Sequence, residues 1–238
     1  MTTWLVTGGS RGIGRAVVEQ VAAEGGQVAT FARSPAAAES GLPPRVLEVK
    51  TDVTDPDSIR RGLDTVHEQL GEIDVVVNGA GVHRGGRIDT IDRSAWDDVL
   101  ATNLTGAFEV CRALTPRLRP GAAIVNVGAV VGFRGFPGDV AYGSAKAGLS
   151  GLTQVLAVEL APRGIRVNLV VPGFVDTDMT AGLSDRARER IVGTIPFGRT
   201  GTAPEIAEVI VAVARSTYMT GATVPVDGGL LATFGGHR

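Results

Sequence analysis

Short apolar segments alternate with longer segments of helical periodicity, and this alternation is the feature that most constrains the fold. The apolar segments lie at residues 4–7, 27–31, 45–49, 73–77, 122–127, 165–170 and 223–226. Apolar residues at helical spacing occur between them, at 13–24, 57–70, 94–118, 141–161 and 203–214. Strands that are apolar throughout are buried on both faces. The pattern therefore predicts an α/β fold over residues 1–238: a single-domain, Rossmann-type doubly wound parallel sheet of about seven strands, with helices on both faces.

The composition argues against several classes of protein. The 238 residues include 23 basic and 25 acidic side chains, and these are interspersed, so no nucleic-acid partner is expected. No apolar run approaches the roughly 18 residues of a membrane span, and the N-terminal residues match no signal peptide. Cys111 is the only cysteine. We therefore expect a cytoplasmic protein with no membrane partner, no intrachain disulfide and no metal site.

A glycine-rich turn separates the first predicted strand from the first predicted helix. It reads Thr-Gly-Gly-Ser-Arg-Gly-Ile-Gly from Thr7 to Gly14. Glycine lets the backbone approach a pyrophosphate closely, and a helix N-terminus presents N–H groups and a positive dipole end to it. The turn therefore predicts a dinucleotide site, whose residues are Gly8, Ser10, Arg11, Gly12, Ile13 and Gly14. The alternative interpretation is a glycine-rich turn that binds nothing.

The end of the second predicted strand indicates which dinucleotide is bound. An NAD-binding fold usually has an acidic residue there to hold the ribose 2′-hydroxyl. Here Arg33 follows the strand, and with Arg11 it could pair with a 2′-phosphate. This predicts NADP(H) rather than NAD(H). Taken alone, Arg33 is equally well interpreted as a solvated loop arginine.

Tyr142 and Lys146 stand four residues apart at the start of the helix predicted at 141–161. This spacing places both side chains on one helix face. A nearby ammonium group favours the phenolate, so we expect the pKa of Tyr142 to be lowered and the phenol to exchange protons near neutral pH. The alternative is a buried tyrosine and a surface lysine on an ordinary helix.

Taken together, these motifs resemble those of the short-chain dehydrogenase/reductase family over essentially the whole chain, most closely the branch that contains the 3-oxoacyl-acyl-carrier-protein reductases. The resemblance rests on the turn from Thr7 to Gly14, on Tyr142 and Lys146, and on four further motifs. These are Asp52-Val53 after the third strand, Asn78-Gly79-Ala80-Gly81 after the fourth, Asn103 within a helix, and Pro172-Gly173 after the sixth.

The resemblance implies a role for each position. Tyr142 would protonate a carbonyl oxygen as hydride arrives, and Lys146 would bind the nicotinamide ribose and lower the pKa of Tyr142. Asn103 would place the water that connects the proton relay to solvent. The cofactor would be contacted at its adenine end by Asp52 and Val53, along its length by Asn78, Ala80 and Gly81, and at its nicotinamide end by Pro172, Gly173, Val175 and Thr177. Alternatively, Asp52 is a turn cap and Asn103 a polar residue at a helix kink.

One position departs from the family pattern. The family carries a serine, usually thirteen residues before the tyrosine, whose hydroxyl hydrogen-bonds the substrate oxygen. Here that position holds Ala129. The loss of one such donor typically slows catalysis about 10²–10³-fold. Three explanations stay open: a serine removed by substitution, a natural enzyme with a self-polarising substrate or another reaction, and a non-catalytic cofactor-binding protein.

Residues 178–201 interrupt the strand–helix rhythm after the sixth strand, and we interpret them as a mobile substrate lid rather than a plain surface excursion. Met179, Leu183 and Ile191 are expected to face the pocket or the core. Other candidates for the substrate mouth are Phe133, Phe136 and His83, although His83 is interpreted as a loop residue rather than a catalyst.

The resemblance also implies a homotetramer that packs through the helices at 94–118 and 141–161 and through the C-terminal strand. The alternative is that these helices only cover the sheet. Arg117 and Arg119 could contact an acidic carrier protein, or simply form a solvated helix end.

The predicted function is the NADPH-dependent reduction of a ketone, a β-ketoacyl or polyketide-type carbonyl that is a small molecule or carrier-bound. Two alternatives remain: a sugar or steroid alcohol dehydrogenase, and a cofactor-bound scaffold with little turnover.

Overall fold

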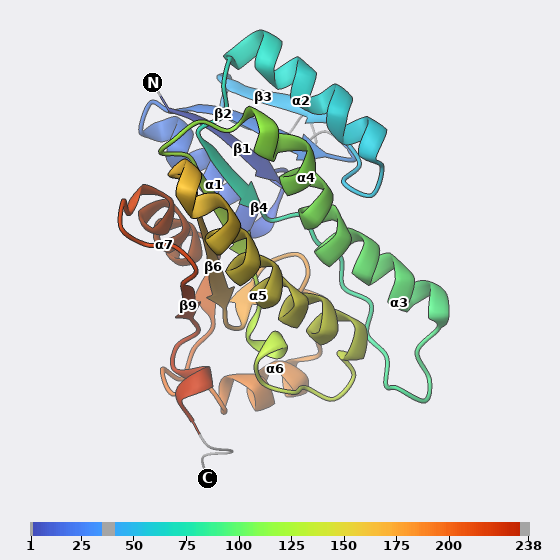
Figure 1. The fold of residues 1–238 in the computed structure, drawn as a ribbon. Helices are drawn as coiled ribbons and strands as arrows, with labels where there is room; N and C mark the ends of the chain where they lie inside the picture. Colours follow the sequence, from blue (N-terminus) through green and yellow to red (C-terminus); the bar gives the residue numbers. More distant parts are fainter. Residues whose placement is uncertain (1, 35–40, 234–238) are drawn as a thin grey trace.

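In this computed structural model seven strands form one parallel sheet in the order β3-β2-β1-β4-β5-β6-β9. Figure 1 shows the sheet between its helices. The structure describes residues 2–34 and 41–233. The predicted fold class is confirmed. The strands are β1 (Thr3–Thr7), β2 (Gln27–Ala32), β3 (Val46–Lys50), β4 (Val75–Asn78), β5 (Ala123–Val127), β6 (Arg166–Pro172) and β9 (Thr223–Val226). Two short strands, β7 (Val175–Asp176) and β8 (Gly201–Thr202), pair separately.

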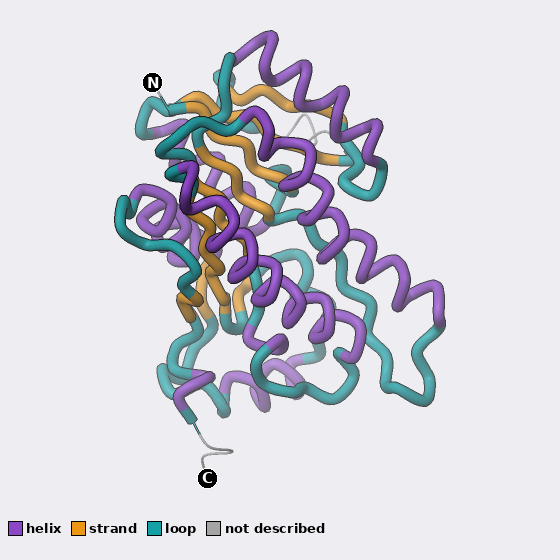
Figure 2. Tube along the Cα trace, in the orientation of Figure 1, coloured by secondary structure: helices purple, strands orange, loops and turns teal. Residues whose placement is uncertain are grey.

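Helices cover both faces of the sheet (Figures 1 and 2). On one face lie α1 (Gly12–Ala23) and α7 (Ala203–Arg215). On the other lie α2 (Pro56–Leu70), α4 (Gly106–Leu114) and α5 (Val140–Leu160). Successive residues of β1 serve both layers: Trp4 and Val6 pack with α1 and α7, whereas Leu5 packs on the opposite side. This two-sided burial explains why the strands are apolar throughout.

The strand order changes direction at β1: β2 and β3 lie on one side of it, and β4 and the later strands lie on the other. β2 pairs with one edge of β1 and β4 with the other, so that Thr7 lies beside Asn78 at the carboxyl ends. In doubly wound sheets this reversal leaves a crevice beyond the carboxyl ends of the strands, where ligands bind. The glycine-rich turn and the segment after β4 both begin at this crevice.

The single helix predicted at 94–118 is wrong in one respect. α3 (Arg93–Leu100) is followed by a π-helical turn, Ala101–Thr105, before α4 begins, and a 3₁₀ turn, Thr115–Arg117, follows α4. Asn103 lies inside the π turn, and its side chain binds both backbone polar groups of Val82. This contact holds the helix to the neighbouring segment. The buried residues of the π turn are the polar Thr102 and Asn103, so apolar periodicity does not report the insertion.

Two predicted helix starts are confirmed. The Asp55 carboxylate caps α2 by accepting from the Asp57 N–H at 2.9 Å. Thr202 and Glu205 form a reciprocal capping box at the start of α7. None of the helices between residues 2 and 233, outside the gap at 35–40, is long and apolar enough to cross a membrane.

Candidate active site

A cavity of about 930 Å³ lies beyond the carboxyl ends of the sheet strands. It runs from the glycine-rich turn to the segment after β6, and it brings together nearly all of the predicted site residues. Those that line it are Gly8, Ser10, Arg11, Gly12, Ile13, Gly14, Arg33, Asp52, Val53, Ala80, Gly81, Ala129, Tyr142, Lys146, Pro172, Gly173, Val175 and Thr177.

The glycine-rich turn forms a cradle that side chains would fill. A Cβ atom on Gly14 would stand 2.4 Å from the carbonyl oxygen of Gly8, and one on Gly8 would stand 2.8 Å from the Cα of Ala80. Gly8 and Gly12 also have φ angles of +76° and +56°, which other residues rarely adopt. The turn leads directly into the N-terminus of α1, whose first turn has no acidic residue. The backbone N–H groups at this end are therefore placed to meet an anion.

Arg33, Asp52 and Val53 line the cavity near the glycine-rich turn, whose Gly8 N–H donates to the Phe31 carbonyl oxygen at the end of β2. Asp52 also caps its own turn, since its carboxylate accepts from the N–H and the hydroxyl of Thr54. Thr51 and Thr102 also line the cavity, but their hydroxyl oxygens are buried and have no partner among the described residues. The Thr51 hydroxyl lies against Gly62 of α2, where a Cβ atom would stand 2.5 Å from it.

Tyr142 and Lys146 lie one helical turn apart on α5 and reach the same cavity wall. Lys146 is 4% exposed, and its ammonium group donates to the carbonyl oxygen of Val127 at 2.7 Å. Its nitrogen lies 5.6 Å from the centre of the Tyr142 ring. Burial of the ammonium lowers the pKa of Lys146 from 10.5 to about 8.

The expected lowering of the Tyr142 pKa is wrong for the protein alone. Burial of the phenol raises the pKa of Tyr142, and the carboxylate of Asp139 raises it further. The ammonium group of Lys146 donates to the Val127 carbonyl oxygen rather than to the phenol. Its charge therefore does not offset the rise in the pKa of Tyr142. The sequence showed the Tyr-Lys spacing, but the nearby carboxylate became apparent only from the structure.

Two predicted residues stand behind the cavity wall rather than on it. Asn78 is buried and donates to the amide oxygen of Asn126 at 2.8 Å, while Asn126 donates to the Thr153 hydroxyl at 2.9 Å. This chain of amides braces β4 against β5 and α5. Asn103 is 1% exposed, and its two bonds to Val82, both of 2.8 Å, fix the segment that leaves β4.

Comparison with known proteins agrees with this arrangement. A family model described as enoyl-(acyl carrier protein) reductase matches residues 8–231. The 3-oxoacyl-acyl-carrier-protein reductase of Escherichia coli (strain K12) is 40% identical over 233 residues, which cover 95% of this chain and 96% of the relative.

Solved structures agree as well. A short-chain dehydrogenase/reductase of Brucella melitensis, described as a glucose/ribitol dehydrogenase, superposes with a TM-score of 0.90 at 30% identity over 96% of both chains. A blue fluorescent protein from a metagenomic library, solved in complex with NADPH, has a TM-score of 0.89 at 32% identity, covering 96% of this chain and 97% of its own. The chain belongs to the short-chain dehydrogenase/reductase family.

Ala129 follows β5 and lines the cavity together with Tyr142 and Lys146. Its methyl group offers no hydrogen bond to a ligand. Ser144 offers no hydroxyl in its place, because it is exposed and donates to the Val140 carbonyl oxygen of its own helix. The cavity wall thus carries a methyl group at position 129, where the resemblance leads us to expect a serine.

His83 and Asp139 form a hydrogen-bonded pair at the same wall. The Nε2 atom of His83 lies 2.7 Å from Oδ1 of Asp139, and both residues line the cavity. The His83 ring packs edge-on against Tyr142, with centroids 5.2 Å apart and planes at 77°. The sequence interpretation placed His83 at the substrate mouth and missed Asp139. Only its position three residues before Tyr142 could have suggested it.

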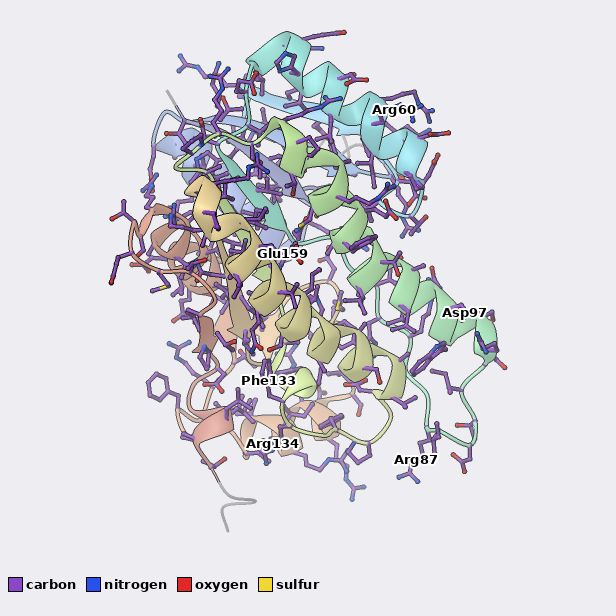
Figure 3. All side chains as sticks on the ribbon, viewed as in Figure 1. Arg60, Arg87, Asp97, Phe133, Arg134 and Glu159 are labelled. Carbon is purple, nitrogen blue, oxygen red and sulfur yellow. The ribbon has the colours of Figure 1, made fainter. Side chains whose placement is uncertain are left out.

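The segment 178–201 covers one side of the cavity and contains α6 (Asp185–Val192). Met179, Leu183 and Ile191 line the cavity, as predicted. Phe136 lines it too, whereas Phe133 is not among the lining residues. Arg134, labelled in Figure 3, also reaches the cavity and donates to the Leu230 carbonyl oxygen at 3.0 Å.

Within residues 2–34 and 41–233, no three His, Cys, Asp or Glu side chains gather in a way that could hold a metal ion. Cys111, the single cysteine, is buried in the core near Asn78, and burial raises the pKa of its thiol to about 11.

Proposed function

We propose that this protein reduces a ketone with NADPH and that Tyr142 delivers the proton. The observation that carries the proposal is a single continuous cavity with a phosphate cradle and Arg33 at one end and Tyr142 with Lys146 at the other. Hydride transfer requires the dinucleotide and the carbonyl substrate to lie in one cavity, which must contain groups that bind phosphate and a proton donor for the carbonyl oxygen. The ketoreductase relative and the NADPH-bound structural neighbour support the same conclusion.

The chain's own residues fit the cofactor. The glycine cradle would hold the pyrophosphate, and Asp52 and Val53 would meet the adenosine end. Arg33 forms no ion pair with any described residue, so its guanidinium is available for a 2′-phosphate. NADPH, when bound, supplies a hydride from its nicotinamide ring.

Tyr142 is suited to give up a proton rather than to take one. Its raised pKa keeps the phenol protonated through the neutral range, so the group can donate to a carbonyl oxygen that gains negative charge. Lys146 would bind the nicotinamide ribose, and its pKa of about 8 leaves it mostly charged at neutral pH. Asn103 lies in a π turn, a feature common at functional sites, and would order the water that resupplies the proton.

The substrate side of the cavity favours an apolar ketone. Met179, Leu183 and Ile191 line the wall that the proposed lid, residues 178–201, contributes. Apolar walls suit an acyl or polyketide chain better than a sugar, whose hydroxyl groups each require a polar partner. We therefore propose a β-ketoacyl or polyketide-type carbonyl, small or carried on a protein. Arg117 and Arg119 are exposed but paired with Asp64 and Glu72, so a carrier would have to compete for them.

We also propose that the protein assembles as a homotetramer through α4, α5 and β9. Exposed apolar side chains on these helices support this: Phe108 is 44%, Val155 55% and Val158 76% exposed. Sedimentation equilibrium is expected to give a tetramer for the parent chain and smaller species for Val158→Arg. A monomeric parent would refute the proposal.

The test of function is the oxidation of NADPH with a short β-ketoacyl thioester. The parent chain is expected to turn over, with a strong preference for NADPH over NADH. Tyr142→Phe is expected to lose about 10²–10⁴-fold in rate. Tyr218→Phe is a matched control, because Tyr218 is fully exposed and away from the cavity.

Two results would contradict the proposal. If NADPH is bound but not oxidised with any thioester or ketone, the cofactor-bound scaffold becomes the better description. If the protein instead oxidises sugar or steroid alcohols with NADP⁺ and ignores ketones, the alcohol dehydrogenase alternative is correct.

A further inference from the structure

The cavity wall carries an imidazole that the reaction scheme above does not use. His83 follows β4 by a few residues, and Asp139 stands just before α5, so the two come from segments 56 residues apart. Their contact is short, 2.7 Å between Nε2 and Oδ1. The side chains are 36% and 17% exposed, which is low enough to keep the pair in one place and high enough for a ligand to reach it.

The backbone around the pair holds it in register with Tyr142. The N–H of Gly86 donates to the Gly138 carbonyl oxygen at 2.7 Å, and Gly86 forms an isolated bridge with Asp139. The two segments are therefore tied together directly beside the His83–Asp139 pair. Packing of the His83 ring on the Tyr142 ring fixes the imidazole against the proposed proton donor.

The geometry leaves one nitrogen of His83 available. The carboxylate of Asp139 accepts from Nε2–H. Nδ1 has no hydrogen-bond partner in the part of the chain that the structure describes. In the protonated imidazole Nδ1 is a donor, and Asp139 then balances its charge at contact distance.

We infer that His83 is a catalytic residue: its Nδ1–H donates a hydrogen bond to the substrate carbonyl oxygen and supplies the donor that Ala129 cannot. This inference rests on the proposed ketone reduction. Asp139 is the positioning residue that orients the imidazole. The carbonyl oxygen then has two donors, the Tyr142 phenol and the His83 imidazole, even though the family's serine hydroxyl is missing.

The test is a double-mutant cycle on kcat and kcat/KM for NADPH-dependent ketone reduction. It compares the parent with Ala129→Ser, His83→Phe and the double variant. His83→Phe keeps an aromatic ring against Tyr142 and removes the Nδ1 donor together with the contact to Asp139. In the parent background we expect it to lower kcat and kcat/KM equally, by about a hundredfold, as for one lost donor in the transition state.

The decisive comparison is the Ala129→Ser background. There a hydroxyl supplies the second donor, so the loss caused by His83→Phe is expected to shrink to about threefold or less. Conversely, Ala129→Ser is expected to gain less than about tenfold in the presence of His83 and about a hundredfold beside His83→Phe. His83→Gln, which retains a side-chain donor, is expected to recover part of the parent rate.

Three outcomes would overturn the inference. Equal losses in both backgrounds would show that His83 only packs against Tyr142. No loss in the parent would show that it is not used. A parent that is inactive until Ala129→Ser restores turnover would show that nothing replaces the serine. Fluorescence titration with NADPH is expected to give the same affinity for all four proteins, which confirms that each variant folds. If all four bind NADPH but reduce no ketone, the proposed function itself fails, and this inference fails with it.

Discussion

Lys146 is a buried lysine in the cavity wall. Its replacement by methionine should change how the free energy of unfolding depends on pH. In the folded protein the ammonium is 4% exposed and holds the Val127 carbonyl oxygen at 2.7 Å. Its pKa falls from 10.5 to about 8 on burial. The folded state therefore disfavours the charged form, and the unfolded chain does not.

The sign and size follow from proton linkage. Between the folded and unfolded pKa values of Lys146 the unfolded chain binds one proton more than the folded protein, so the free energy of unfolding rises with pH. Below the folded pKa both states are protonated, and the buried charge costs about 3 kcal/mol. At pH 10 most of this cost has gone. Lys146 should thus make the parent about 2–3 kcal/mol more stable at pH 10 than at pH 7.

The Lys146→Met variant isolates this contribution. Every other titrating group is present in both proteins, so the difference between their unfolding free energies reports Lys146 alone. Both proteins are unfolded with urea at pH 7, 8, 9 and 10, at one protein concentration and without cofactor. The free energy of unfolding of the parent, relative to that of the variant, should rise steadily with pH. The raised pKa of Tyr142 keeps the phenol neutral over this range.

A flat difference would refute the reasoning. It would mean that Lys146 titrates as it does in water, and so that its ammonium group is not desolvated by the cavity wall. The absolute difference at pH 7 is a weaker test, because the variant also leaves the Val127 carbonyl oxygen without its donor, which costs roughly 1–3 kcal/mol.

Three further outcomes are expected. Asp139→Asn should lower the pKa of Tyr142, since it removes the neighbouring carboxylate; near-ultraviolet titration will show this as earlier tyrosinate formation, and no change would contradict it. Arg33→Asp should raise the KM for NADPH at least about tenfold, because a cation facing the 2′-phosphate becomes an anion. The ratio of kcat/KM for NADPH to that for NADH should fall for the same reason. Unchanged constants for both cofactors would show that Arg33 does not contact the cofactor. Gly14→Ala should lose NADPH binding in fluorescence titration, because its Cβ would stand 2.4 Å from a carbonyl oxygen of the same turn. The control Gly25→Ala should bind normally while losing about 1 kcal/mol of stability at a φ of +83°; equal binding by both would contradict the cradle.

The motifs that meet a cofactor could be predicted from the sequence because they are local. A glycine at position 14 is required by the turn to which it belongs, and Tyr142 and Lys146 share a helix face by spacing alone. The covering of both sheet faces by helices could be anticipated as well, because strands that are apolar throughout are buried on both faces. The position of Arg33 after β2 could be predicted from the same alternation of strand and helix patterns.

Features that depend on distant segments could not be predicted in this way. The π turn at Asn103 exists because its side chain reaches Val82, 21 residues earlier. The raised pKa of Tyr142 reflects burial by the assembled cavity wall together with the carboxylate of Asp139. Neither effect leaves a mark on apolar periodicity.

The sequence by itself determined the doubly wound sheet, the cradle and the Tyr-Lys pair, since each depends on residues within one turn or one helix. Only the tertiary structure decided which groups share the cavity wall. It brought His83 from the segment after β4 to Asp139 at the start of α5, 2.7 Å apart, in the cavity that Ala129 also lines. Electrostatic and hydrogen-bonding chemistry depends on distance in space, and distances between segments are set by how the helices and strands pack.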